Sequence, residues 1–334
     1  MTMIPADFLI LFLIIISFVF VTGLCIGSFL NVVILRAFSD ESIAGPGSKC
    51  PQCQTSLKWY HNIPVLSYLF LKGKCAYCSK KISLQYPIVE LLTGFLFVAV
   101  FIKFGPTINA IFMLIFASLF IVLATTDIKE KVVFDFHTYA LVIVGLVYNL
   151  FNVGNLYPGV KLITLGSLSF GINNSIIAAV LGILLGIIVM EAFARFGYLV
   201  AGTRAFGEGD TYIAAGLGAI FGWKYLIMAL IYSFVIQIIF TIPLFLKKLY
   251  CNKDYKTLIA FIAFFLFTIC FKLLNLAGAS SNLLFFGILV LILCGLGLYT
   301  CRRILGGLKN QENMTFLPFG PAMVVGGFFV MFLL

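Results

Sequence analysis

Runs of apolar residues separated by short polar stretches cover nearly the whole chain. These runs span roughly residues 8–35, 87–104, 109–126, 136–151, 174–194, 211–223, 225–246, 257–275, 283–300 and 317–334. Because a helix needs ~20 mainly apolar residues to cross a bilayer, the pattern predicts an all-α polytopic membrane protein with about 8–10 transmembrane helices. The sixth run is short and rich in glycine, so we expect it to be tilted, broken or only partly inserted.

The composition supports a membrane protein and argues against a soluble one. The chain is 62% hydrophobic and 10% charged, with a mean hydropathy of +1.14. Only Asp7 precedes the first run as a charge, and no basic segment does, so this run does not resemble a cleavable signal peptide. The net charge of +10 is interpreted as a consequence of topology and of contact with anionic membrane lipids. No nucleic-acid readout chemistry is found.

The lysines and arginines predict the orientation of the helices. Ten spans divide the loops between the two sides of the membrane, and one side receives residues 36–86, 127–135, 195–210, 247–256 and 301–316. Of the 22 lysines and arginines, 18 fall in these loops and four lie elsewhere. Because cytoplasmic loops carry an excess of positive charge, these five loops are predicted to be cytoplasmic and both termini extracytoplasmic.

The only long polar stretch, residues 36–86, contains two Cys-x2-Cys pairs. The four thiols belong to Cys50, Cys53, Cys75 and Cys78. Each pair can direct two thiolates at one tetrahedral ion, so the spacing predicts a closed, structural zinc site that stabilises a loop too small to form a core. Two disulfides are the alternative, but reduced cytoplasmic thiols favour metal. His61 could also ligate, although a surface role fits it better.

Two carboxylates are predicted to lie at the same depth on the cytoplasmic side. Asp127 closes the third apolar run, and Asp210 opens the sixth within the sequence "FGEGD". If the two meet, they cannot both ionise cheaply, so they would share a proton. One could then deprotonate water while the other protonates a scissile carbonyl oxygen, which hydrolyses a peptide bond. Gly207 and Gly209 would let an extended substrate backbone approach Asp210.

Simpler interpretations of the acidic residues stay open. Asp210 and Glu208 could only mark a helix start, where carboxylates complement the dipole. Asp135 competes with Asp127 as the partner of Asp210, or it could be an N-cap. Glu191 lies four residues before Arg195, which predicts an ion pair on one helix.

Some polar residues of the membrane segments have no assigned role. Glu90 lies about one turn into the second predicted helix without an obvious local partner, and it could bind a polar group. Ser28 and Asn31 could hydrogen-bond between helices or contribute to a site. The glycine pairs Gly23/Gly27 and Gly182/Gly186 are typical of close helix packing in lipid.

Five motifs follow one another along the chain: "GLCIGSFLNVVILR" (23–36), the cysteine loop with "YPIVELLTG" (50–94), "TDIKEKVVFD" (126–135), "FGEGDTYIAAGLGAIFGW" (206–223) and "LPFGPAM" (317–323). In this order they resemble the motifs of the prepilin peptidases, the type IV leader peptidases of bacterial pilus and type II secretion systems. The chain departs from the family pattern at Lys129, Phe134 and Tyr212. Five ordered motifs are far more specific than a lone GxGD.

The resemblance implies an enzyme of the bacterial inner membrane. It implies that Asp127 and Asp210 are the catalytic dyad, and that the substrate is the basic leader of a prepilin or pseudopilin, cleaved at the cytoplasmic membrane face. It also implies N-methylation of the new N-terminus with S-adenosylmethionine. No strand-linked Gly-x-Gly-x-x-Gly is present, so a Rossmann-type cofactor site is excluded, and the residues that bind this cofactor are not identified.

The same reading divides the chain into five parts. We expect a first transmembrane helix at 1–35, a zinc loop associated with methyl transfer at 36–86, a peptidase core at 87–246, an inserted helical hairpin with cytoplasmic flanks at 247–316, and a last helix at 317–334.

Three rival functions stay open. Another GxGD intramembrane protease would carry YD and PAL motifs, where this chain has Thr126-Asp127 and "LPFGP". A proton- or cation-coupled transporter would place its carboxylates near the bilayer midplane, at broken helices. A non-catalytic assembly factor would have no need of the two aspartates.

Overall fold

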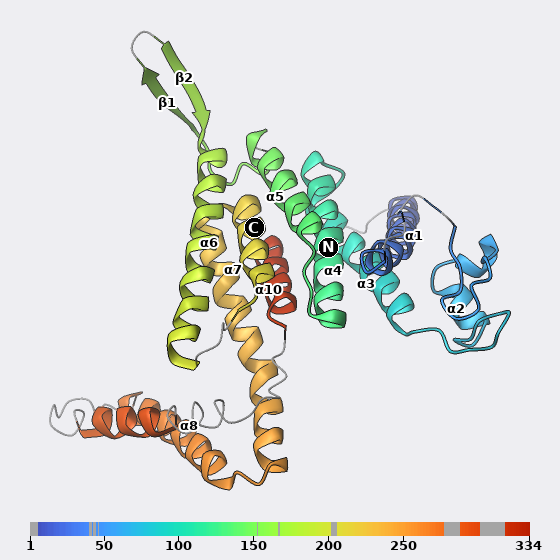
Figure 1. Cartoon of the computed structure of the whole chain (residues 1–334). Helices are drawn as coiled ribbons and strands as arrows, with labels where there is room; N and C mark the ends of the chain where they lie inside the picture. The colour runs from blue at the N-terminus through green and yellow to red at the C-terminus, as the bar shows by residue number, and fades with distance from the viewer. Residues whose placement is uncertain are drawn as a thin grey trace. The chain divides into compact units, whose positions relative to one another are not determined.

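The computed structural model describes residues 6–39, 42, 45, 47–151, 153–165, 168–201, 206–276, 288–300 and 318–334 (Figure 1). Some predicted features lie outside the described residues: the 301–316 loop with Cys301, Arg204, and Leu317 of the closing motif.

The helices follow the apolar runs, which confirms the helical membrane fold. Their bounds are α1 (Ala6–Arg36), α3 (Gln85–Phe104), α4 (Ile108–Glu130), α5 (Asp135–Leu150), α6 (Asn174–Ala201), α7 (Glu208–Cys251), α8 (Tyr255–Leu276) and α10 (Gly320–Leu333), with a further helix at Ile288–Thr300. Among the described residues, six helices are long and apolar enough to cross a membrane, and three apolar helices are shorter. Two small helices, η1 (Trp59–Asn62) and α2 (Leu66–Phe70), lie in the polar loop.

Helix α7 consists of two helices joined at Gly222. Its 44 residues would extend about 66 Å, twice the hydrocarbon thickness, and Gly222 has a non-helical φ of 71°. Contacts with α10 show that the chain reverses direction at Gly222. Successive residues of α10 contact residues of rising number in the first part of α7 and residues of falling number in the second part. They pair Gly320 with Ile213, Gly327 with Leu217, Phe319 with Phe234, and Gly326 with Ala229. The two separate runs expected at 211–223 and 225–246 are therefore confirmed.

Side chains cap the backbone groups that this break leaves unpaired. Asn149 Nδ2 donates to the carbonyl oxygens of Ala219 at 2.8 Å and Ile220 at 2.9 Å. The Tyr157 hydroxyl donates to the carbonyl oxygen of Phe221 and accepts from the N–H of Lys224, both at 3.2 Å. Because unpaired buried backbone groups are costly, these contacts stabilise the tight reversal of the chain at Gly222.

One element was not expected from the sequence. Residues Val160–Leu165 (β1) and Leu168–Asn173 (β2) form a two-stranded antiparallel hairpin, with Val160 opposite Asn173 and Leu165 opposite Leu168. It connects α5 to α6, and the rest of the described chain has no other named strand.

The chain divides into two compact units. The first comprises residues Met1–Met190, Glu208–Phe234 and Pro318–Leu334, and the second comprises Glu191–Gly207 and Val235–Leu317. Large side chains of α4, α7 and α10 form the core of the first unit, among them Phe116, Phe120, Ile213, Leu217 and Met323, all without solvent exposure. In the second unit, the rings of Phe245 and Phe261 pack with centroids 6.1 Å apart.

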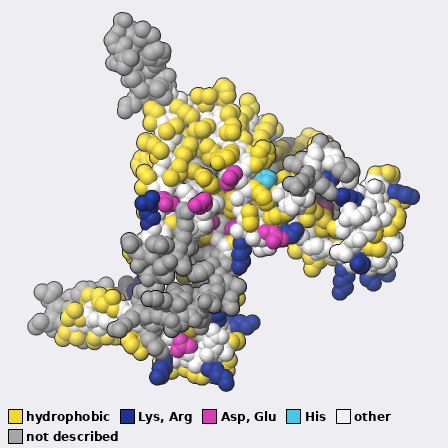
Figure 2. All heavy atoms as spheres, in the orientation of Figure 1, with side chains coloured by type: hydrophobic (Ala, Val, Ile, Leu, Met, Phe, Trp, Pro, Cys, Tyr) yellow, Lys and Arg dark blue, Asp and Glu magenta, His cyan; other side chains and the backbone are white. Residues whose placement is uncertain are grey.

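The glycine pairs allow close helix contacts, as expected. A Cβ at Gly23 would collide with the backbone of Gly94, and one at Gly27 with that of Glu90, so α1 and α3 pack antiparallel. A Cβ at Gly182 or Gly186 would likewise collide with the backbone of Gly218 or Ala214, which fixes α6 against α7. Hydrophobic side chains cover the visible face of α5 and α6, while lysine and arginine side chains gather on the loop that contains α2 (Figure 2).

Candidate active site and metal centre

The two Cys-x2-Cys pairs of the cysteine loop, residues 36–86, form two turns with the same hydrogen bonds. Cys50 N–H donates to the Thr55 carbonyl at 3.0 Å, and its own carbonyl accepts from Gln54 N–H at 2.9 Å. Twenty-five residues later, Cys75 makes the corresponding bonds with Lys80 at 2.8 Å and Ser79 at 3.0 Å. The last turn residues, Gln54 and Ser79, both have φ of 56°. Local backbone structure therefore presents each pair of thiols in the same way.

The four thiols converge on one point. The Sγ atoms of Cys50, Cys53, Cys75 and Cys78 all lie within 4.8 Å of one another. Ligands at 2.3 Å from a tetrahedral zinc ion lie about 3.8 Å apart, and Cys50 Sγ and Cys78 Sγ are 4.0 Å apart. This separation is too long for a disulfide, and all four cysteines are free. Hydrogen bonds from the side chain and backbone of Thr55 lower the pKa of Cys53 to about 6. For Cys78, a backbone hydrogen bond at Lys80 is outweighed by burial and by the other three thiols, which raise its pKa to about 11. The residues fit a zinc ion.

His61 does not belong to this cluster of thiols. Its ring packs between those of Tyr60 and Tyr77, with centroids 4.5 Å and 5.4 Å away. It is half-buried rather than fully on the surface. Its role is therefore in the packing of the loop.

Asp127 lies in the last turn of α4 and is only 5% exposed. The helix ends four residues later at Lys131, whose left-handed conformation (φ 55°) lets its N–H bond to the Asp127 carbonyl at 2.9 Å. One carboxylate oxygen, Oδ2, is buried and receives no side-chain hydrogen bond, and the backbone of Gly320 lies against the carboxylate. A buried carboxylate with so few donors is unusual, and such groups often mark a site that binds something.

Asp210 lies in the first turn of α7 and is 8% exposed. The adjacent Gly209 packs so closely on Val133 that any Cβ there would collide with the valine side chain. This gives Gly209 a packing role next to the loop that follows Asp127. Gly207 is exposed, so it retains the role suggested for both glycines, approach of a substrate backbone.

Both aspartates lie at one end of the bundle formed by α4, α5, α7 and α10, which we call the aspartate end. Gly320, the first residue of α10, lies against the Asp127 carboxylate and against Ile213, one turn beyond Asp210. The space between these groups has no room for a side chain at position 320. Sequence reasoning matched the motif around Gly320 to the family but assigned this residue no role. A glycine directly before a proline at a helix start is the only local signal.

Other buried polar groups at this end also escaped the sequence reasoning. His137 is 6% exposed and its Nδ1 has no partner, and the buried Oγ1 of Thr211 also has none. His137 lies on the face of α5 that packs on α7, because Leu141 and Asn149, at helical spacing from it, contact Gly216 and Ala219. The signal was available: one of only two histidines in the chain lies in an apolar helix.

The other acidic candidates differ from Asp127 in their surroundings. Asp135 is exposed and is the first residue of α5, and the N-cap is Phe134. Glu130 and Glu208 are also exposed. Glu191 forms the expected ion pair with Arg195, at 3.2 Å. Burial therefore separates Asp127 and Asp210 from these surface acids.

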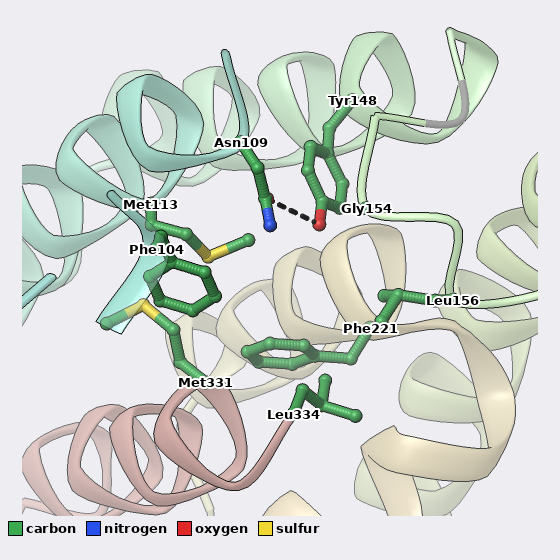
Figure 3. Close-up of a pocket in the computed structure, with 9 residues that line it drawn as sticks. All are labelled: Phe104, Asn109, Met113, Tyr148, Gly154, Leu156, Phe221, Met331 and Leu334. Atoms are coloured by element: carbon green, nitrogen blue, oxygen red, sulfur yellow. Dashed lines mark hydrogen bonds between the residues drawn. The ribbon is translucent and has the colours of Figure 1, made fainter. Parts of the chain in front are cut away.

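The opposite end of the same bundle holds only a small cavity of about 40 Å³ (Figure 3). Its walls are Phe104, Asn109, Met113, Tyr148, Gly154, Leu156, Phe221, Met331 and Leu334. The Tyr148 hydroxyl donates to Asn109 Oδ1 at 3.0 Å. Asn109 and Asp127 are 18 residues apart on α4, so this cavity lies about 27 Å from the aspartate end. A cavity of this size holds about one water molecule and no peptide.

Comparison with known proteins identifies two family regions. Residues 21–104 match the bacterial peptidase A24 N-terminal domain, and residues 114–242 match the type IV leader peptidase family. The chain is 36% identical over 214 residues to a prepilin leader peptidase/N-methyltransferase of Klebsiella pneumoniae, covering 62% of this chain and 86% of that protein. It is 37% identical over 216 residues to one of Myxococcus xanthus, covering 65% of this chain and 59% of that protein. A third, of Neisseria gonorrhoeae, is 32% identical over 252 residues, 68% of this chain and 82% of that protein. No solved structure matches the chain.

Proposed function

The chain belongs to the type IV leader peptidase family, and we propose that it is a membrane aspartic endopeptidase that removes the leader from type IV prepilins or pseudopilins. We propose that it also N-methylates the new N-terminus. The observation that carries the peptidase assignment is the buried Asp127 carboxylate, which no side chain pairs, at the bundle end that also holds the buried Asp210.

In the proposed reaction, Asp127 and Asp210 share one proton. The ionised carboxylate takes a proton from a water molecule while the protonated one donates its proton to the scissile carbonyl oxygen. The water oxygen bonds to the carbonyl carbon and gives a tetrahedral diol. The carbon–nitrogen bond then breaks as the leaving amine takes the proton that the first carboxylate received from water, and a diol hydroxyl returns its proton to the second carboxylate, which restores the shared proton. Burial supports this assignment, because two carboxylates in a poorly solvated site cannot both ionise cheaply.

The aspartate end faces the cytoplasm in this proposal. The positive charges of the loops predict that side, and the family relation supports a bacterial inner membrane. A basic prepilin leader in the cytoplasm, followed by an apolar segment in the lipid, would present its cleavage site at this depth. The substrate backbone would pass the exposed Gly207 next to Asp210.

Zinc and S-adenosylmethionine have different roles in the proposal. Zinc, held by Cys50, Cys53, Cys75 and Cys78, stabilises the cysteine loop and has no free position for catalysis. S-adenosylmethionine supplies the methyl group when bound. The five-part division of the chain, with the peptidase core at 87–246 and an inserted hairpin at 247–316, is part of the same proposal.

Co-expression with a candidate prepilin tests the peptidase assignment. We expect Asp127→Asn and Asp210→Asn each to abolish leader removal, measured by mass spectrometry of the pilin. The exposed Asp135→Asn variant is the matched control and should process the substrate with little change. Loss of processing in Asp135→Asn alone would overturn the dyad assignment.

A further inference from the structure

The proposed hydrolysis does not use one buried carboxyl group, which lies between α1 and α3. Glu90 is 6% exposed, and its Oε2 accepts a hydrogen bond from Val65 N–H at 2.7 Å. Ser28 of α1 lies beside the same carboxylate. Within the described part of the chain, no lysine or arginine forms an ion pair with Glu90. An acidic side chain at membrane depth is costly, so it is a functional candidate by default.

Asn31 places an unused acceptor near Glu90. It is 1% exposed, and its Nδ2 donates to the carbonyl oxygens of Gly27 at 3.3 Å and Tyr86 at 3.1 Å. These bonds fix the amide, and its Oδ1 remains buried without a partner. A buried amide oxygen without a donor costs free energy unless a ligand or water supplies one. Gln85 Nε2, next to Tyr86 in sequence, is also buried without a partner.

The packing of α1 on α3 brings these groups to neighbouring turns. Gly27 lies opposite Glu90, and Asn31 lies opposite Tyr86, which is one helical turn before Glu90. One turn corresponds to about 5.4 Å along the axis. Two acceptors of one tetrahedral ammonium group, each about 2.8 Å from the nitrogen, lie about 4.6 Å apart. Side chains on neighbouring turns would have to lean toward each other by about 1 Å along the axis to share one small cationic group.

The cysteine loop contacts this cluster through a strained turn. Leu66 N–H donates to the Pro64 carbonyl at 2.6 Å, which makes Val65 the central residue of a γ-turn with φ 60° and ψ −49°. A β-branched residue in this conformation is strained and persists only where its surroundings fix it. The hydrogen bond to Glu90 is such a constraint, and it ties the loop that holds the thiols to α3.

We propose that Glu90 and Asn31 bind the primary ammonium group of an amino-acid-like ligand, and that Gln85 Nε2 donates to its adjacent carbonyl or carboxylate oxygen. This inference rests on the methylation activity of the proposed function. Two ligands of that reaction share this chemistry: the free N-terminus of the cleaved peptide, and the methionine part of S-adenosylmethionine. The cluster lies where the cysteine loop meets α1 and α3.

Binding to the purified full-length protein in lipid nanodiscs tests the proposal. One probe is a synthetic peptide with the mature N-terminal sequence of a pilin and a free amine, compared with its N-acetylated form. The other is S-adenosylhomocysteine, which carries the same amino-acid group without the methyl. We expect Glu90→Gln to weaken binding of at least one amine probe by about tenfold or more, without changing that of the acetylated peptide. The probe whose binding is weakened identifies the source of the ammonium group.

Two further variants separate charge from structure. Glu90→Asp keeps the negative charge but shortens the reach to Val65, so it should retain the preference for the free amine if charge is responsible. Glu130→Gln removes an exposed acid and should bind every probe like the wild type. Two outcomes would overturn the proposal: amine binding that no substitution of Glu90 changes, or amine binding that Glu90→Gln and Glu90→Asp reduce equally. In either case the role of Glu90 would be only to hold the cysteine loop against α3.

A measurement on the wild type covers the case in which Glu90→Gln does not fold. An apolar carbodiimide should couple the free amine of the bound peptide, or of S-adenosylhomocysteine, to Glu90 as an amide that mass spectrometry detects. Coupling to other acids only would contradict the proposal. Prepilin cleavage measured on the same preparation keeps the two proposals apart, because absent cleavage would contradict the peptidase and leave the binding result standing.

Discussion

The cysteine loop and the aspartate end are built in opposite ways. In the loop, each half positions its two thiols through hydrogen bonds within eight residues, and the second half repeats the first. At the aspartate end, the groups that meet come from α4, α7 and α10, and Asp127 and Gly320 are far apart in sequence. The first site depends on local turns and a metal, and the second depends on how three helices pack.

This difference predicts how each site fails. Loss of metal should unfold the loop and leave the helix packing intact. A small change in helix packing should disable the aspartates and leave the thiols unaffected. The predictions below test that separation, from the largest effect to the smallest.

Gly320→Val should disable the aspartate end while zinc binding is retained. A side chain at this position would meet the Asp127 carboxylate and Ile213, and displacement of a catalytic group by about 1 Å costs on the order of 10²-fold in rate. Prepilin cleavage by purified protein measures the effect, and elemental analysis checks the metal. Gly295→Ala is the matched control, since nothing lies within 4 Å of a Cβ there. Full activity of Gly320→Val would show that this contact is unimportant.

The double variant Cys50→Ser/Cys78→Ser should lose its zinc. Wild type should contain about one ion per chain, because four thiolates complete one tetrahedral shell. Without it, we expect rapid proteolysis between residues 47 and 83, since a loop of this size cannot form its own core. Residual prepilin cleavage should exceed that of Asp127→Asn. Metal-free wild type with a protease-resistant loop would refute the zinc site.

Asn149→Ala should destabilise the break in α7 moderately. The change leaves the buried carbonyls of Ala219 and Ile220 without their donor, which costs about 1–3 kcal/mol. Tyr157→Phe, which removes one hydroxyl at the same break, should cost about 1 kcal/mol. Thermal unfolding in detergent measures both. An unchanged midpoint for Asn149→Ala would mean that water or another group caps these carbonyls.

The sequence predicted those features that depend on local pattern. The apolar runs predicted the helices, including the two halves of α7, because a helix that crosses lipid needs a long apolar segment and such a segment is visible in the sequence. The four thiols were predicted because two Cys-x2-Cys pairs at this spacing are typical of a tetrahedral zinc site. Gly23, Gly27, Gly182 and Gly186 were correctly assigned to close packing.

The remaining features depend on contacts between distant segments. Gly320 and His137 became candidates only when α10 and α5 were seen against α4 and α7. The β1–β2 hairpin was missed because residues 152–173 lie between two strong helical signals and were not assessed for strands. Gly209 was linked to substrate approach, whereas its close contact with Val133 could not be known before the fold.

The most direct test of the shared-proton pair is a double-mutant cycle on cleavage. Single-turnover rates of prepilin hydrolysis would be measured for purified wild type, Asp127→Asn, Asp210→Asn and the double variant. Groups that act as a unit are not additive, so we predict that each single variant loses at least about 10³-fold and that the double variant loses no more. Losses that multiply in the double variant, or substantial cleavage by either single variant, would contradict the account.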